Sequence, residues 1–154
     1  MDELRLTFHR ATAGQPLPLP LSDESVQAGF PSPASDYFAA DLDLNDLLIR
    51  HKEATFYVRI AGDSMTDAGI LDGDLAIVDK AATASDGDFV IACINGEFTI
   101  KQFRLAPGGE KGRLVAWNNR YPSIEVCAYD DFRIWGVVTH VIHPLKKRKP
   151  HEKG

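Results

Sequence analysis

Asn95-Gly96 lies between two runs of strand-forming residues, and this dipeptide constrains the fold more than any other feature of the sequence. An Asn-Gly pair between strands predicts a two-residue type I′ hairpin, because both turn residues must adopt positive φ angles. Such a turn also fixes which residues of the two strands face each other. The predicted facing pairs are Ile94 with Glu97, Ala92 with Thr99, and Val90 with Lys101.

The predicted hairpin puts a lysine on an apolar strand face. In this register Lys101 shares its face of the sheet with Val90, Ala92, Ile94 and Phe103. An ionised lysine is costly to bury, and desolvation favours its neutral form. A neutral amine can accept the proton of a serine hydroxyl, as the general base of a Ser/Lys dyad does. The alternative is that Lys101 lies on an edge strand and extends its ammonium group to water.

The remainder of the chain predicts a compact, mainly-β domain with one short helix. The helix is expected from Leu44 to His51, with Asp43 as its N-cap. Seven segments rich in Val, Ile, Phe, Tyr and Trp are separated by Gly, Asp, Asn and Pro clusters, which is typical of short strands. The expected strands are Thr55–Ile60, Leu75–Val78, Phe89–Ile94, Phe98–Leu105, Leu114–Trp117, Ile124–Cys127 and Phe132–Ile142.

Three regions differ in composition. In residues 1–40, Pro16, Pro18 and Pro20 alternate with leucines and no strand or helix period persists, which predicts an extended N-terminal arm. Residues 41–144 form the predicted β domain. Residues 145–154 are rich in Lys and Arg, and we interpret them as a solvated, disordered tail rather than an anchor for phosphate groups.

Bulk composition excludes several classes of protein. The 154 residues fit one domain, and the net charge of −5 gives no reason to expect direct DNA binding by the surface. Cys93 and Cys127 lie in apolar runs and are expected to be free thiols in a reducing compartment. No segment is apolar enough for a secretion signal or a membrane span, so we expect a soluble, cytoplasmic protein without a membrane partner.

The segment Gly62-Asp63-Ser64-Met65 follows a predicted strand and displays a serine at its end. It is not the G-x-S-x-G nucleophile elbow, because Thr66 stands where the second glycine would be. The alternative role for Ser64 is a hydrogen bond within its own turn. The histidines offer neither a Ser/His/Asp triad nor a metal site, since His140 and His143 point to opposite strand faces. We expect no metal and no cofactor.

Six segments, taken in order and spacing, resemble the LexA/UmuD family of self-cleaving Ser/Lys peptidases. The resemblance covers roughly residues 26–143. The segments are Ala28-Gly29-Phe30-Pro31-Ser32-Pro33-Ala34, Asp43-Leu44-Asn45 with Leu47-Leu48-Ile49, Gly62-Asp63-Ser64-Met65, Gly73-Asp74-Leu75, Asn95 to Lys101, and Trp135-Gly136-Val137-Val138.

The resemblance implies a role for individual residues. Ser64 matches the family's nucleophile, Lys101 its general base, and Ala28-Gly29 its cleavage site, with Gly29 as the new N-terminus. The backbone amides of Asp63 and Ser64 would form the oxyanion hole. UmuD relatives commonly have Cys where this chain has Ala28, whereas LexA-type repressors have Ala.

The length of the N-terminal segment indicates the UmuD branch, because about 28 residues with several prolines cannot build the helix-turn-helix domain of a LexA-type repressor. The branch implies a homodimer that cuts itself when stimulated by RecA filaments on single-stranded DNA. The processed form then joins an UmuC-type error-prone polymerase in the SOS response. Two alternatives are a non-catalytic polymerase-docking subunit with a relic dyad, and a signal-peptidase-like enzyme, which would need a membrane anchor.

Overall fold

The computed structural model describes residues 7–10, 16–21, 28–29, 41–108, 112–126 and 131–146, with residues 7–10 described by their backbone. Eight strands form one sheet in the order β1-β4-β5-β10-β6-β7-β8-β9, and every pairing in it is antiparallel. Their bounds are β1 (Thr7–Arg10), β4 (Thr55–Arg59), β5 (Leu75–Asp79), β6 (Phe89–Ile94), β7 (Glu97–Leu105), β8 (Gly112–Val115), β9 (Ile124–Glu125) and β10 (Phe132–Ile142).

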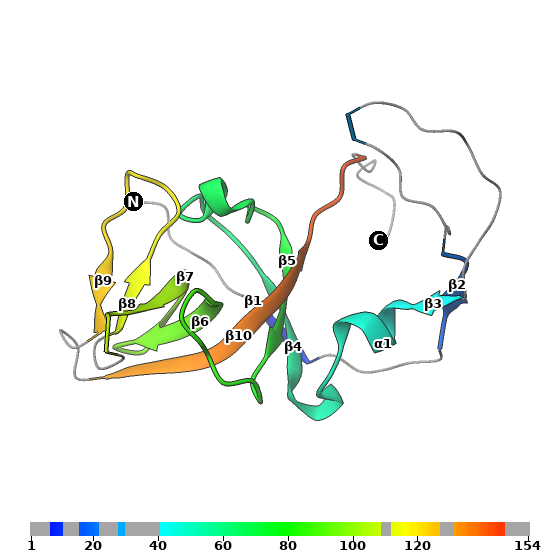
Figure 1. Ribbon diagram of the computed structural model, residues 1–154, viewed down its shortest axis with the longest axis horizontal. Helices are drawn as coiled ribbons and strands as arrows, with labels where there is room; N and C mark the ends of the chain where they lie inside the picture. Colours follow the sequence, from blue (N-terminus) through cyan, green and yellow to red (C-terminus); the bar gives the residue numbers. More distant parts are fainter. Residues whose placement is uncertain are drawn as a thin grey trace.

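Figure 1 shows this sheet curving into the body of the molecule, with a smaller unit extending from one side. The smaller unit pairs β2 (Pro18–Leu19) with β3 (Leu42–Asp43), and α1 (Leu44–Leu48) follows directly. Two short 3₁₀ helices, η1 (Lys52–Ala54) and η2 (Thr66–Ala68), flank β4. The prediction of a mainly-β fold with one short helix is therefore confirmed.

The hairpin between β6 and β7 has the predicted turn and register. Asn95 has a φ of 50° and Gly96 a φ of 81°, as a type I′ turn requires. Ile94 faces Glu97, and the ladder continues through Val90 facing Lys101. The local turn chemistry alone thus determines on which face of β7 the lysine lies.

The helix begins as predicted but ends earlier. The carboxylate of Asp43 accepts a hydrogen bond from the N–H of Asn45 at 3.0 Å, which is the expected N-cap. We predicted an end at His51, whereas α1 ends at Leu48 because Ile49 turns to an extended conformation and is buried. Burial of that apolar side chain overrides the local helical spacing.

The N-terminal region contains strand structure that the sequence pattern did not predict. We expected no strand within residues 1–40, yet Thr7–Arg10 forms the edge strand β1 against β4. Pro18–Leu19 also pairs, with β3. The backbone hydrogen bonds of β1 come from pairing with the edge of β4, which is distant in the sequence. A four-residue segment has no local pattern that would indicate such a partner.

Strand β10 crosses the middle of the sheet and pairs with both β5 and β6. Its register shifts between Ile134 and Gly136 against β6, and between Val138 and His140 against β5. A Cβ at Gly136 would lie 2.6 Å from a methyl carbon of Val78, so only glycine fits this approach of two strands.

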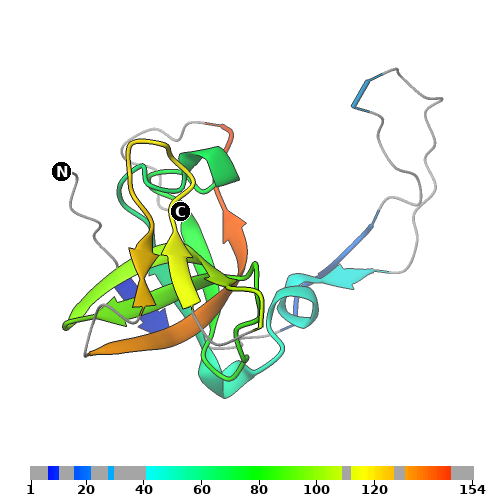
Figure 2. The same cartoon turned by 60° about the vertical axis from the view of Figure 1, so that its left-hand side comes forward.

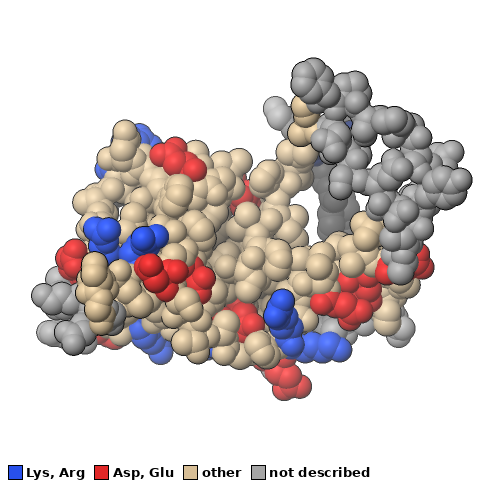
Figure 3. All heavy atoms as spheres, viewed as in Figure 1, with Lys and Arg blue, Asp and Glu red and all other residues tan. Residues whose placement is uncertain are grey.

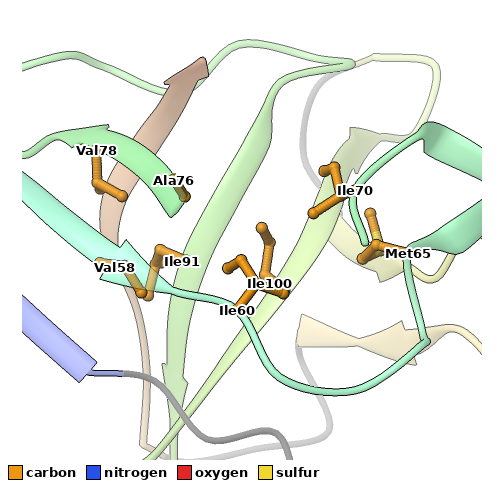
Figure 4. Packing of buried hydrophobic residues seen from close by; sticks show 8 residues of the cluster. All are labelled: Val58, Ile60, Met65, Ile70, Ala76, Val78, Ile91 and Ile100. Atoms are coloured by element: carbon orange, nitrogen blue, oxygen red, sulfur yellow. The ribbon is translucent and has the colours of Figure 1, made fainter. Parts of the chain in front are cut away.

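Side chains pack into two apolar clusters on opposite faces of β6. Ile91 belongs to a cluster that also contains Ile60, Met65, Ile70 and Ile100, and Figure 4 shows Met65 and Ile70 beside Ile60 and Ile100. Val90 and Ala92 belong to a second cluster, with Leu114 and Val137. Cys93 is a buried free thiol, as predicted, while Cys127 lies outside the described residues.

Candidate active site

Ser64 lies in the loop between β4 and η2, and the residue is 9% exposed. Gly62 opens the loop with a φ of 102°, a backbone conformation that favours glycine. The Gly62 N–H donates to the Asp72 carboxylate at 2.8 Å, and the Thr66 hydroxyl donates to the Asp63 carbonyl at 2.6 Å. These bonds hold the serine loop from both sides.

The residue after the serine fixes the loop to the core. Met65 is 2% exposed and packs in the cluster shown in Figure 4. Its carbonyl also accepts hydrogen bonds from the N–H groups of Ala68 and Ile70. The position of Ser64 is therefore determined by apolar packing one residue away, which leaves its hydroxyl free to interact with another side chain.

Lys101 lies on β7 and is 7% exposed. Its Nζ atom is 3.2 Å from the Ser64 Oγ, 2.8 Å from the Thr99 Oγ1 and 3.0 Å from the Ile100 carbonyl oxygen. The structure thus brings together the two side chains that the sequence singled out 37 residues apart. It also places Lys101 inside the protein, which excludes the alternative of an ammonium group extended to water.

Burial changes the acidity of this lysine. Desolvation lowers the pKa of Lys101 from 10.5 to about 8. Its three neighbouring atoms are neutral oxygens, so none of them offers a counter-charge that would favour the ammonium form. A fraction of the lysine is therefore neutral near pH 7, and that fraction grows as the pH rises.

The hydrogen-bonding groups of the neutral Lys101 amine match its three neighbours in a way that allows it to accept a proton. It carries two N–H groups and one lone pair. The Ile100 carbonyl can only accept, and the Thr99 hydroxyl can accept the second N–H. The lone pair then remains for the third neighbour, the hydroxyl proton of Ser64. This arrangement can withdraw a proton from the serine during attack on a carbonyl carbon.

A second loop, residues 116–121, holds the serine loop through hydrogen bonds that sequence reasoning missed. The Trp117 N–H donates to the Ser64 carbonyl at 2.9 Å, and the Asn118 side chain donates to the Asp63 carbonyl at 2.9 Å. The Tyr121 hydroxyl donates to the Asp63 carboxylate at 2.5 Å, and Arg120 pairs with the same carboxylate. The run of polar residues from Asn118 to Tyr121 could have indicated a hydrogen-bonding loop. No local pattern indicated that its partner is the serine loop.

The backbone N–H groups of Asp63 and Ser64 were predicted to bind an oxyanion. In the described part of the chain, no protein group accepts a hydrogen bond from either of them. Both amides are thus available to a substrate oxygen. The bonds from Asn118 and Thr66 to the Asp63 carbonyl restrict rotation of the peptide unit that carries the Ser64 N–H.

Ala28 and Gly29 are exposed and lie apart from Ser64 and Lys101. A Cβ built on Gly29 would meet no described atom within 4 Å outside its chain neighbours, so a side chain at this position has open space around it. Figure 2 shows this short segment well away from the curved sheet. The structure therefore does not bring the predicted cleavage site to the dyad, and the arm has to move before the two can meet.

The described histidines form individual contacts with their neighbours. His51 lies 2.6 Å from the buried Asp79 carboxylate, and His143 lies 3.5 Å from Asp74. His140 is exposed on β10 beside Thr139. Across the residues that the structure describes, no three His, Cys, Asp or Glu side chains gather as a metal site would require.

One further hollow lies elsewhere in the molecule. A cavity of about 190 Å³ opens between α1, β5 and β10, and its lining contains neither Ser64 nor Lys101.

On the face drawn in Figure 3, acidic and basic side chains are interspersed over the body. Among the helices of the described ranges, none is long and apolar enough to cross a membrane.

Comparison with known proteins identifies the family. The sequence model of the family described as Peptidase S24-like matches residues 20–139. The chain belongs to the peptidase S24-like family. It is 38% identical over 141 residues to Protein MucA of Salmonella typhimurium, which covers 90% of this chain and 94% of that protein. It is 47% identical over 127 residues to Protein SamA of Salmonella typhimurium, at 82% and 86% coverage.

The chain also matches part of the LexA repressor of Clostridium kluyveri. It is 42% identical over 116 residues, which covers 73% of this chain but 53% of the repressor. The chain thus matches about half the length of the repressor, whereas it matches most of MucA and SamA. The family resemblance inferred from the sequence motifs is confirmed.

Proposed function

We propose that this S24-like chain is a serine endopeptidase that cleaves its own Ala28-Gly29 bond, with Ser64 as nucleophile and Lys101 as general base. One observation carries the proposal: a buried lysine whose pKa is lowered to about 8 lies 3.2 Å from a serine hydroxyl in a loop held at both ends. Membership of a peptidase family supports the same chemistry.

In the first step, the Ser64 Oγ attacks the carbonyl carbon of Ala28 and its proton passes to the Lys101 Nζ. Negative charge develops on the carbonyl oxygen, where the N–H groups of Asp63 and Ser64 would stabilise it. The bond from Ala28 to Gly29 then breaks, and the Lys101 ammonium returns the proton to the leaving amine. The products of this step are an Ala28 ester on Ser64 and a free Gly29 amine.

In the second step, neutral Lys101 takes a proton from a water molecule that attacks the ester. The ester carbon–oxygen bond breaks, and the proton passes back to the Ser64 Oγ. The Ala28 carboxylate is released and the dyad is restored. Because Ala28 and Gly29 are exposed and distant from the dyad in the structure, docking of the arm limits how often this chemistry begins.

The biological setting that we propose follows from the relatives. MucA and SamA match the chain over most of their length and support a role in SOS mutagenesis. We propose a cytoplasmic homodimer that is stimulated to cut itself by RecA filaments on single-stranded DNA. Its processed form, residues 29–154, would serve an UmuC-type error-prone polymerase. Residues 1–40 act as the arm, residues 41–144 as the peptidase domain and residues 145–154 as a basic tail.

The second candidate function is a polymerase-docking subunit whose dyad no longer reacts. One experiment separates the two: the mass of the purified protein is measured after incubation at alkaline pH, beside a Ser64→Ala variant. We expect a fragment beginning at Gly29 from the parent chain and none from Ser64→Ala. An uncut parent chain, with or without added RecA filaments, would favour the docking role.

The site assignment has its own test. Ala28→Trp and Gly29→Lys should block cutting, because a bulky side chain at either position prevents close approach of the bond to Ser64. Both variants should still cleave a separately added peptide that spans the parent site, which shows that their dyad is intact. If cutting moves to another bond in these variants, the assignment of Ala28-Gly29 is wrong.

A further inference from the structure

Strand β1 covers the edge of the eight-stranded sheet. Its backbone runs antiparallel to β4 through four facing pairs, from Thr7 opposite Arg59 to Arg10 opposite Phe56. The other side of β4 pairs with β5. Without β1, β4 would therefore be the edge strand, and its outer row of N–H and C=O groups would have no strand partner.

The covering strand belongs to the segment that cleavage would remove, a point that rests on the proposed function. Residues 1–28 contain both β1 and β2, and β2 pairs with β3 through two further facing pairs. While the chain is intact, the arm keeps β1 at a high effective concentration beside β4. After the cut, two short strands must bind a separate molecule, and strands of this length are only marginally stable.

We propose that cleavage uncovers β4 as a self-association edge, on which a second processed copy adds its own β4 to form a continuous sheet. The same cut uncovers an identical edge on every copy, so both halves of this interface arise together and at equal concentration. An intact chain cannot take part, because its edge already holds β1. This contact is additional to the homodimer implied by the family resemblance.

The geometry of β4 suits pairing with itself. Two copies of one strand related by a two-fold axis are antiparallel, and β4 is antiparallel to both of its present neighbours. With the axis at Tyr57, the middle residue of the strand, Phe56 faces Val58 of the second copy and Thr55 faces Arg59. No like charges face each other in this register, so charge repulsion does not oppose it.

The test compares three proteins by sedimentation at the same concentration. They are a directly expressed chain of residues 29–154, full-length Ser64→Ala, and a Ser64→Ala chain that lacks residues 1–10. We expect the first and third to contain at least twice as many chains per particle as the second, in a manner that grows with concentration, because only these two have an open β4 edge in addition to the homodimer contact. No self-cleavage is needed, so failure of the proposed function would leave this test valid.

Substitutions at the axis sharpen the test. Tyr57→Glu in the chain of residues 29–154 places two carboxylates against each other and should abolish the extra association, while Tyr57→Phe should retain it. Circular dichroism checks that both variants fold. A peptide of residues 5–12 should compete for the edge. Equal masses for the cut and intact chains would overturn the proposal, as would peptide binding to the cut chain without any self-association.

Discussion

Two buried ionisable side chains, one on β5 and one on β7, have opposite surroundings. Asp79 is 5% exposed, and its carboxylate accepts a backbone hydrogen bond from Ala81 at 2.8 Å and lies 2.6 Å from the His51 imidazole. Lys101 on β7 is 7% exposed, and the hydrogen-bond partners of its amine among the described residues are three neutral oxygens. The Asp79 oxygens are buried with hydrogen-bond partners from the backbone and from a ring nitrogen, whereas the described neighbours of the Lys101 amine carry no charge.

This difference distinguishes a structural role for a buried ionisable side chain from the catalytic role proposed for Lys101. Donors around a buried carboxylate satisfy its oxygen atoms and hold the chain in place. A buried amine without a counter-charge is instead destabilised as an ammonium and is available as a base. The same comparison applies to Asp74, which is 1% exposed and accepts a hydrogen bond from the Leu71 N–H at 2.8 Å.

The largest expected effect tests whether Lys101 acts as a base. Lys101→Arg should lower self-cleavage by about 10³-fold or more at every pH, because a guanidinium stays protonated and cannot accept the serine proton. The rate of appearance of the Gly29 fragment is the measurement, with folding checked by circular dichroism. An active arginine variant would remove Lys101 from the general-base role.

The pH dependence follows from the lowered pKa. Below about pH 8 the rate of self-cleavage should rise about tenfold per pH unit, and above it the rate should level off as Lys101 becomes fully neutral. A series from about pH 6 to 11 measures the profile. Asp79→Asn serves as the matched control, since it changes another buried ionisable side chain and should leave the profile unshifted. A flat profile in the parent chain would contradict this mechanism.

Replacing Lys101 by an apolar residue should raise the free energy of unfolding, whereas replacing a structural residue lowers it. The folded-state pKa of about 8 lies below the ordinary 10.5, so burial of the ammonium destabilises the fold fully below pH 8. That penalty declines as the pH rises and is gone above about 10.5. In a Ser64→Ala background, Lys101→Met should raise the free energy of unfolding by up to about 3 kcal/mol near pH 7. Urea denaturation at pH 7 and pH 10.5 measures the difference.

Removing the Asp79 carboxylate should destabilise the fold instead. Asp79→Asn should lower the free energy of unfolding by about 1–3 kcal/mol, because the amide replaces an acceptor with a donor that faces the His51 ring or the Ala81 N–H. Urea denaturation at pH 7 measures the loss, and Arg50→Ala, a nearby exposed change, is the control. If Asp79→Asn is neutral for stability yet slows cleavage, the two sites are coupled.

Much of the candidate site follows from local chemistry that the sequence displays directly. Asn95-Gly96 fixes the register that buries Lys101, and the Gly62-Asp63-Ser64-Met65 segment indicates the serine loop. Taken separately, each element has another interpretation: Lys101 could extend to water, and Ser64 could hydrogen-bond within its own turn. The family motifs are what indicate that the two side chains meet. Short-range rules suffice where a turn sets the geometry.

Features that depend on distant segments were not predictable. The pairing of Thr7–Arg10 with β4, and the hold of loop 116–121 on Asp63, join residues about 50 positions apart with no local pattern to indicate their partners. The pairing of His51 with Asp79 spans 28 positions and was missed for the same reason. In each case a polar or backbone group gains its partner only when the sheet has closed.

Because Trp117 is hydrogen-bonded to the serine loop, its intrinsic fluorescence can report on events at the site. The sequence has two tryptophans. Trp117 is 39% exposed and its backbone N–H bonds directly to the Ser64 carbonyl, so an arm that enters the site changes the surroundings of the indole on the same residue. Trp135 is packed against Phe56, Phe98 and Lys80, so we expect arm docking to change its surroundings less. Fluorescence of a Trp135→Phe variant would therefore record arm docking in real time, before any peptide bond is broken.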